Sequence, residues 1–188
     1  MIKILLVITT AALVMVGVLY GLFLLSLLVS LFYGTPYIGI PKKSVREILA
    51  FGELDSSDIF YDLGSGDGRV LTAAAEYFKI ARAAGFEMAP LPYFISRIRI
   101  ALKRLGEHIT IHYKSFLKAD LSSASFVYVY LYRELLNEKV APKLARELRH
   151  STKVLSCSSP IDTTRYPQFH LLKTSKIGNI TVFLYEKI

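Results

Sequence analysis

The stretch Phe60-Tyr-Asp-Leu-Gly-Ser-Gly-Asp-Gly-Arg-Val70 decides the fold. An apolar, strand-like run leads into glycines at every second position, Gly64, Gly66 and Gly68, and an Ala-rich, helix-like segment follows. Glycines are needed where a chain turns sharply and lets a ligand approach the backbone. This order of strand, glycine loop and helix predicts a ligand-binding crossover in a parallel sheet.

An acidic residue follows at the end of the next predicted strand. Glu87 lies 19 residues after Gly68, and an acid at this place can accept the hydroxyl groups of a ribose. The dinucleotide fingerprint has its third glycine one position later, and a pyrophosphate prefers a helix N-terminus without nearby negative charge. Here Asp62 and Asp67 flank the glycines, so the loop suits a ligand that carries an ammonium and a sulfonium group. This combination points to S-adenosylmethionine, whereas an incidental glycine-rich turn would not require the acid.

Strand-like and helix-like segments alternate along the rest of the chain. Alternation of this kind predicts an α/β fold with a parallel sheet, and a closing pair of strands without a helix between them adds an antiparallel strand. Ser44–Glu47 has the pattern of a capping box that opens a short helix. Longer helices are expected at Gly68–Phe78, Pro90–Leu105 and Leu135–His150, and strands at Ile59–Leu63, Ala83–Met88, Ile109–Tyr113, Phe126–Leu131, Thr152–Cys157, His170–Lys173 and Ile180–Tyr185.

A long apolar segment precedes this domain. From Ile4 to Phe32 there is no charged residue in 29 positions, and such a helix would be about 43 Å long, against about 30 Å for a hydrocarbon core. A cleaved signal peptide would have a shorter apolar run and a small-residue cleavage site. We therefore expect residues 1–33 to form a transmembrane anchor, 34–42 a linker and 43–188 the globular domain.

Charge and composition narrow the class of protein. The chain has 188 residues, 53% of them hydrophobic, and a net charge of +8. Its basic residues are scattered, which argues against nucleic acid and favours proximity to anionic lipid headgroups. Lys3 before the apolar segment is outnumbered by Lys42, Lys43 and Arg46 after it, which favours a domain that faces the cytoplasm, or the matrix in a mitochondrion.

Cysteine and histidine usage exclude two further kinds of site. Cys157 is the only cysteine, so the chain forms no internal disulfide, and its apolar neighbours indicate a buried core thiol. The four histidines show no spacing typical of metal ligands, so we expect no bound metal.

The pattern Asp62-x-Gly64-x-Gly66-x-Gly68 resembles the first motif of the class I S-adenosylmethionine-dependent methyltransferases. The resemblance implies a Rossmann-like sheet of seven strands, the last antiparallel, with helices on both faces. It implies that Asp62 lies near the methionine ammonium of S-adenosylmethionine, Gly64 and Gly66 beneath the cofactor, and Glu87 on the ribose. The complete expected set of cofactor-binding residues is Asp62, Leu63, Gly64, Ser65, Gly66, Asp67, Gly68, Arg69, Glu87, Met88, Ser115 and Phe116.

A narrower resemblance covers nearly the whole chain. The segments GTPYIGIP, DLGSGDGRV, GFEMAP and FVYVYLYRELLNEKVAPKLARELRHSTKVLS are similar to the membrane-anchored protein-lysine methyltransferases related to the mitochondrial ATP synthase c-subunit enzyme. It implies that 43–188 form a methyltransferase domain. Ala89 departs from the family, which has Asn there, and Lys114-Ser115 stand where many class I enzymes carry an acid that holds the adenine.

The residues that we expect to contact the substrate are aromatic. A lysine must lose its proton before it attacks a methyl group, and aromatic rings can hold its cation beforehand. Tyr130, Tyr37 and Tyr132 are the substrate-lining candidates. Enzymes that methylate adenine or glutamine amides carry an [N/D]-P-P-Y run after the fourth strand, where this chain has Tyr130-Leu-Tyr-Arg133.

Three functions stay open on the sequence alone. The first is a membrane-anchored enzyme that methylates a lysine of a membrane-associated protein. The second is a methyltransferase for a lipid, quinone or other small molecule at the bilayer, and the third is a non-catalytic module that binds the cofactor within an assembly. Only Pro160–Pro167 separate the fifth and sixth strands, so no recognition insert is visible. Tethering would raise the effective concentration of any target in the same bilayer.

Overall fold

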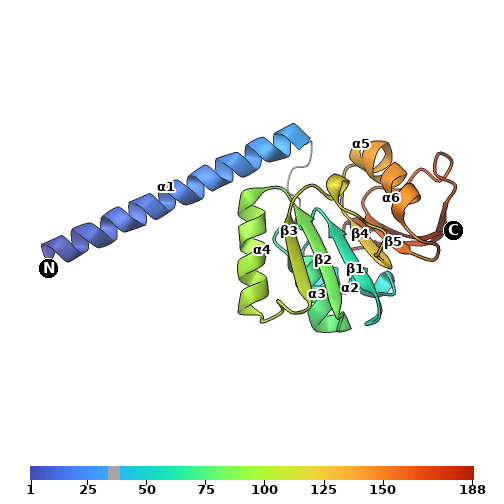
Figure 1. Cartoon of the computed structure of the whole chain (residues 1–188), viewed down its shortest axis with the longest axis horizontal. Helices are drawn as coiled ribbons and strands as arrows, with labels where there is room; N and C mark the ends of the chain where they lie inside the picture. Colours follow the sequence, from blue (N-terminus) through green and yellow to red (C-terminus); the bar gives the residue numbers. More distant parts are fainter. Residues whose placement is uncertain (34–38) are drawn as a thin grey trace.

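The computed structural model describes residues 1–33 and 39–188. A long helix, α1 (Ile2–Tyr33), leads to an α/β domain built on one seven-stranded sheet (Figure 1). The strand order is β3-β2-β1-β4-β5-β7-β6. The strands are β1 (Ile59–Leu63), β2 (Arg82–Glu87), β3 (Ile109–Tyr113), β4 (Phe126–Val129), β5 (Lys153–Cys157), β6 (Phe169–Ile177) and β7 (Ile180–Lys187).

The sheet is mixed, as the sequence predicts. Strands β1 to β5 pair in parallel, and β7 inserts antiparallel between β5 and β6. The predicted seven-stranded sheet with a final antiparallel strand is thus confirmed. Strands β6 and β7 are both longer than predicted. The sequence did not reveal the full length of β6, because its side chains are mostly exposed and it lacks the apolar run that marks a buried strand.

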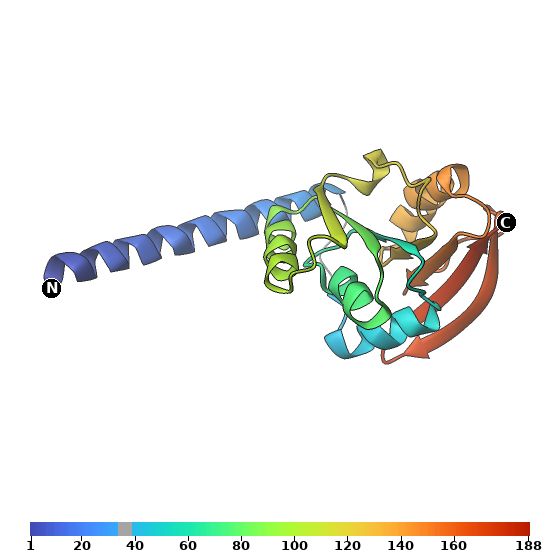
Figure 2. The same cartoon turned by 60° about the horizontal axis from the view of Figure 1, so that its bottom comes forward.

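Helices cover both faces of the sheet (Figure 2). Helices α2 (Lys42–Phe51), α3 (Arg69–Phe78) and α4 (Pro90–Leu102) contribute to one apolar core, and the segment that contains α6 (Ala141–Glu147) contributes to the other. The central strand β4 sends Phe126 and Tyr128 into the first core and Val127 and Val129 into the second. Burial on both faces explains why this stretch is apolar without alternation.

Two local predictions were wrong. The Ser44–Glu47 capping box does not open α2, because the helix begins at Lys42 after Pro41 and has no side-chain cap. The Ser44 N–H already donates to the Pro41 carbonyl at 2.9 Å, which places Ser44 inside the first turn.

The predicted helix Leu135–His150 is interrupted. It consists of α5 (Arg133–Leu135), a π-helical turn η2 (Leu136–Val140) and α6, which ends at Glu147. Pro142 follows the π turn; proline has no N–H to donate to a helical carbonyl, and a wider turn accommodates this loss.

Only the last turns of α1 touch the domain. Residues 2–21 are exposed, whereas Leu22 and Val29 are partly buried and Ser26 is buried. The Ser26 hydroxyl accepts the N–H of Leu91 in α4 at 3.0 Å and donates to the Leu22 carbonyl at 2.8 Å. The spacing of Leu22, Ser26 and Val29 defines one helix face, so α1 is fixed against α4 along that face.

A close approach in β2 gives a test of the packing beneath the glycine loop. A Cβ added at Gly85 would lie 2.5 Å from Leu71 Cδ1 and 2.7 Å from Ser65 Oγ. We expect Gly85→Ala to lower the free energy of unfolding by about 1–3 kcal/mol through overpacking, as measured by urea unfolding in detergent. At Gly106 an added Cβ meets no described atom within 4 Å, so Gly106→Ala should change stability by less than about 0.5 kcal/mol. Equal effects at both positions would contradict this packing.

Candidate functional site

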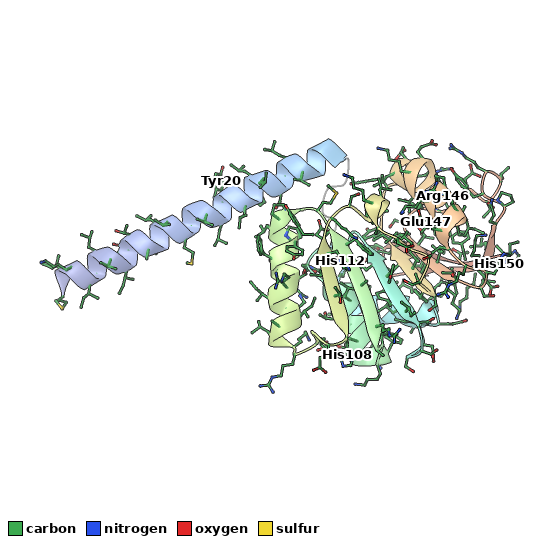
Figure 3. All side chains as sticks on the ribbon, in the orientation of Figure 1. Tyr20, His108, His112, Arg146, Glu147 and His150 are labelled. Carbon is green, nitrogen blue, oxygen red and sulfur yellow. The ribbon has the colours of Figure 1, made fainter. Side chains whose placement is uncertain are left out.

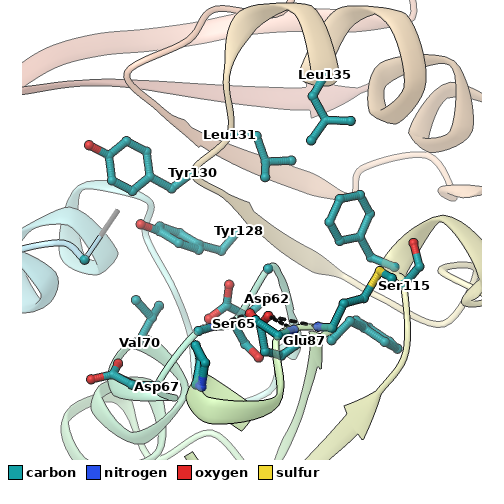
Figure 4. A pocket seen from close by; sticks show the side chains of 18 of the residues that line it. Asp62, Ser65, Asp67, Val70, Glu87, Ser115, Tyr128, Tyr130, Leu131 and Leu135 are labelled. Carbon is teal, nitrogen blue, oxygen red and sulfur yellow. Dashed lines mark hydrogen bonds between the residues drawn. The ribbon is translucent and has the colours of Figure 1, made fainter. Parts of the chain in front are cut away.

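The main pocket lies at the carboxyl ends of β1, β2 and β4 (Figure 4). The chain goes from β1 outward to β2 and β3 and then returns to β4 on the other side of β1. A reversal of this kind opens a crevice above the strand ends, where α/β sheets bind their ligands.

The glycine loop forms the floor of this pocket. Gly64, Gly66 and Gly68 have φ angles of 89°, 54° and 74°, a left-handed backbone that residues with a side chain rarely adopt. The N–H groups of Gly64 and Ser65 both donate to the Phe86 carbonyl at 3.0 Å. The loop is therefore held to the end of β2, and Gly64 and Gly66 add no side chain to the pocket that they line.

Glu87 closes the loop from the side of β2. One carboxylate oxygen accepts the N–H of Gly66 at 2.9 Å, and the other accepts those of Met88 and Ala89 at 2.9 and 2.6 Å. Burial raises the pKa of Glu87, and these three N–H groups offset part of that rise. Each carboxylate oxygen has two lone pairs, and the oxygen that accepts only the Gly66 N–H keeps one of them, so Glu87 can also accept a ligand hydroxyl in the pocket that it lines.

Asp62 is a buried acid without a matching base. It is 2% exposed, and its Oδ2 atom has no hydrogen-bond partner among the described residues. Burial raises the pKa of Asp62 well above its usual value, and the negative charges of Glu87 and Asp67 add to the rise. The Ser65 and Tyr128 hydroxyls are also buried without a described partner. Unpaired buried polar groups are costly, so this end of the pocket suits a ligand that brings a positive charge and hydrogen-bond donors.

Asp67, in contrast, is neutralised within the protein. Its Oδ2 atom lies 2.9 Å from Arg69 Nη2 and 2.7 Å from Arg99 Nη2. Burial acts to raise the pKa of Asp67, but the hydrogen bonds and charges of Arg69 and the charge of Arg99 outweigh it and hold the pKa below its usual value. Arg69 Nη1 also donates to the Ile40 carbonyl at 2.6 Å. Asp67 and Arg69 thus join the glycine loop to the chain that enters the domain.

The other predicted residues divide into those that line the pocket and those that do not. Ser115, Phe116, Met88, Arg69 and Tyr130 line it. Two predicted residues lie outside the lining: Leu63, which is buried in the core on β1, and Gly68, which packs against Ser96 of α4. Tyr132 is 42% exposed and does not line the pocket, and Tyr37 lies outside the described residues.

Several lining residues were not predicted. Leu131, Leu135 and Lys139 reach the pocket from the chain after β4, together with Val29 of α1 and Gly39 and Ile40 ahead of α2. The i, i+4 spacing of the first three could have indicated one helical face. Nothing in an uninterrupted apolar run singles out Val29.

Among residues 1–33 and 39–188, no group of His, Cys, Asp or Glu side chains is placed to hold a metal ion. Figure 3 labels His108, His112 and His150 at three separate places on the domain. Cys157 is buried as predicted, and burial raises its thiol pKa to about 12.

Comparison with known proteins identifies the family. The model of the ANTKMT methyltransferase domain matches residues 62–168, which is more than half of the chain. The chain belongs to this family. As a member, it is an S-adenosylmethionine-dependent methyltransferase of the class that the sequence predicts.

Individual relatives agree with this assignment. The methyltransferase is 36% identical over 126 residues to a protein-lysine N-methyltransferase of Saccharolobus islandicus, covering 64% of this chain and 74% of that one. It is 30% identical to the human lysine N-methyltransferase of the ATP synthase c-subunit, covering 80% of this chain but 61% of the relative. An RNA methyltransferase from Salinibacter ruber, solved with S-adenosyl-L-homocysteine, superimposes with a TM-score of 0.73 at 25% identity, over 80% of this chain and 94% of that one.

The pocket fits S-adenosylmethionine on the evidence of its own residues. The glycine loop leaves the floor open, since a Cβ at Gly64 would have only Leu131 within 4 Å among the described atoms. Asp62 offers a desolvated oxygen without a partner among the described residues, and Glu87 offers a further lone pair. Acceptors of this kind are what the ammonium group and a ribose hydroxyl of S-adenosylmethionine require.

The two acids that flank the glycines should respond oppositely to substitution in the cofactor-free protein. Burial raises the pKa of Asp62 in the folded protein well above its usual value, so the folded state binds this proton more tightly than the unfolded chain does, and the group lowers stability as pH rises above about 4. We expect Asp62→Asn to raise the free energy of unfolding by about 1–3 kcal/mol at pH 7.5, and to have little effect near pH 4. Asp67→Asn should lower it by a similar amount at pH 7.5, because it removes the charge that Arg69 and Arg99 share.

Urea unfolding at the two pH values measures these effects, and calorimetry with S-adenosylhomocysteine measures the cost in binding. Asp62→Asn should weaken S-adenosylhomocysteine binding even though it stabilises the protein. A destabilised Asp62→Asn protein, or one with unchanged affinity, would contradict the role given to its unpaired oxygen.

Proposed function

We propose that this methyltransferase is anchored in a membrane and methylates a lysine side chain of a membrane-associated protein. The observation that carries the proposal is the position of Val29, which belongs to the apolar helix α1 and also lines the cofactor pocket. The pocket therefore opens beside the end of α1. A target that reaches this pocket has to lie close to whatever surrounds that helix.

The dimensions of α1 support the anchor. In the part of the chain that the structure describes, α1 contains one stretch, Ile2–Val29, that is long and apolar enough to cross a membrane. Its residues 2–21 are exposed and would be about 30 Å long, which is the thickness of a hydrocarbon core. The hydroxyls of Thr9 and Thr10 donate to the Leu6 carbonyl, so they stay paired in lipid.

The proposed division of the chain is the one that the sequence suggests, and these contacts support it. Residues 1–33 form the anchor, 34–42 the linker and 43–188 the methyltransferase domain, which would sit directly at the membrane surface because α1 packs on α4 from Leu22 onward. The excess of positive charge after α1 favours the cytoplasmic or matrix side.

The residues of the pocket have separable roles in this proposal. Asp62 binds the methionine ammonium of the cofactor, Glu87 accepts the ribose hydroxyls, and Gly64 and Gly66 lie beneath the ligand. When bound, S-adenosylmethionine would supply a methyl group on a positively charged sulfur. A neutral amine would bond to the methyl carbon as the carbon–sulfur bond breaks, and S-adenosylhomocysteine would leave. Positioning of the amine and exclusion of water can together contribute several kcal/mol.

The residues of the pocket set the environment of the target amine. Tyr130 and Leu135 line the pocket and would desolvate the target lysine, which lowers its pKa and favours the neutral form. The Tyr130 ring can hold the protonated amine on arrival. Lys139, also in the lining, adds a positive charge that disfavours a second one nearby.

Lysine is favoured as acceptor by the relatives that are named protein-lysine methyltransferases. The direct test incubates the full chain with native membranes and tritiated S-adenosylmethionine, followed by separation of lipid from protein and amino-acid analysis. We expect label in methyl-lysine of a membrane protein. Label confined to the lipid fraction would replace this proposal with methylation of a lipid or quinone, and no label above background would leave a cofactor-binding module.

Two neighbouring tyrosines provide a matched pair for the substrate side. Tyr130→Leu removes a ring that lines the pocket, and the loss of about 0.5–2 kcal/mol from a cation–π contact would lower kcat/KM by roughly 2- to 30-fold. Its affinity for S-adenosylhomocysteine should stay near that of the unchanged protein.

Tyr132→Leu serves as the control, since Tyr132 is 42% exposed and does not line the pocket. It should leave both kcat/KM and cofactor affinity unchanged. Equal losses of kcat/KM in the two variants would show that Tyr130 has no special contact with the substrate.

A further inference from the structure

Helix α4 carries an exposed apolar row along its outer side. Phe94, Ile98 and Leu102 follow one another at i+4 spacing and are 48%, 60% and 79% exposed. The inner side of the helix is the row Pro92, Ser96 and Ile100, which is buried against the domain. A helix with apolar rows on both sides lacks the polar outer face of an ordinary surface helix, so the outer row has no explanation within the fold.

Positive charge borders this apolar row, and negative charge is missing from it. No acidic residue occurs between Glu87 and Glu107. Within this stretch, Arg99 pairs with Asp67 and Lys103 with Glu76. Arg97 and Arg104 are exposed, and no ion pair joins either of them to another described residue.

Aromatic rings extend the same surface beyond the helix. Tyr113, at the end of β3, is 56% exposed, and its ring centroid lies 5.0 Å from that of Tyr93 in α4. The Arg97 guanidinium lies 6.0 Å from the centre of the same Tyr93 ring. Tyrosine and arginine side chains of this kind are enriched where a protein meets the headgroup region of a membrane.

The surface also lies in the right place for a membrane contact. Helix α4 forms the edge of the domain nearest to the free N-terminal part of α1, and it runs steeply across the direction of α1 (Figures 1 and 2). Its first turn is bonded to α1 through Leu91 and Ser26. A membrane crossed by residues 2–21 would therefore end close to the outer side of α4.

We propose that α4 is a second membrane contact, which lies in the interface of an anionic bilayer with Phe94, Ile98 and Leu102 among the acyl chains and Arg97 and Arg104 at the lipid phosphates. An apolar helix face bordered by basic residues is typical of helices that lie in the plane of the interface. This inference rests on the proposed anchoring by α1 and deepens it. A single span leaves the domain free to rotate and tilt, whereas two contacts fix the height and direction of the pocket mouth above the membrane.

The test measures the surroundings of single nitroxide labels on the full chain in vesicles of phosphatidylcholine and phosphatidylglycerol. The only native cysteine, Cys157, is fully buried, so an introduced cysteine can be labelled selectively. Leu102→Cys reports on α4. Leu13→Cys, in the exposed part of α1 at 73% exposure, reports on insertion, and Leu172→Cys, 43% exposed on β6 at the opposite edge of the sheet, is the aqueous control.

Collisions with oxygen report on lipid, and collisions with a water-soluble nickel chelate report on water. We expect the oxygen-to-nickel ratio of the Leu102→Cys label to exceed that of Leu172→Cys by at least about threefold, because the first would be buried in the interface. Ile98→Cys should behave like Leu102→Cys.

Three results would overturn the inference, and they differ in whether they also contradict the anchoring by α1. A lipid-exposed label at Leu13→Cys with a water-exposed label at Leu102→Cys rejects the α4 contact and leaves the anchor intact. Protection of the Leu102→Cys label from both reagents means that protein, rather than lipid, covers α4. A water-exposed label at Leu13→Cys rejects the anchor and the α4 contact together.

Discussion

The carboxylate of Glu87 connects the parts on which the site depends. It accepts the N–H of Gly66 in the glycine loop and those of Met88 and Ala89 just before α4. A bare carboxylate buried at a strand end would be costly, and three charge-assisted hydrogen bonds offset that cost. Since α4 holds α1 through Leu91 and Ser26, one short path of bonds leads from the cofactor loop to the apolar helix.

The two aspartates of the loop divide the electrostatic work. Asp67 forms ion pairs with Arg69 and Arg99. Its role is structural, because Arg69 also donates to the Ile40 carbonyl. Asp62 is left desolvated and unpaired among the described residues, a state that lowers stability and is tolerated where a ligand supplies the missing charge. The sequence alone could not separate them, since both acids flank the same glycines and only the fold brings Arg99 to Asp67 and leaves Asp62 buried.

What the sequence could predict depends on how local each signal is. The glycine loop, Glu87 and the order of strands and helices follow from nearby residues, and they suffice for the seven-stranded methyltransferase fold. The start of α2 was mispredicted because Pro41 outweighs the Ser44–Glu47 pattern, and the π turn before Pro142 has no local signature. The contribution of Val29 to the pocket depends on the docking of α1 on α4, which is long-range. The apolar residues of α4 were visible in sequence, but only the fold shows which of them face outward.

In the proposed function, membrane geometry contributes much of the selectivity of the enzyme, because it confines the enzyme and its target to one bilayer. The most direct measurement reconstitutes the full chain and the proteins of native membranes either in one population of vesicles or in two populations that are then mixed. If tethering selects the target, methyl-lysine should form faster in the shared vesicles by a factor on the order of 100. Equal rates in the two arrangements would contradict the central claim that this methyltransferase finds its target through the bilayer.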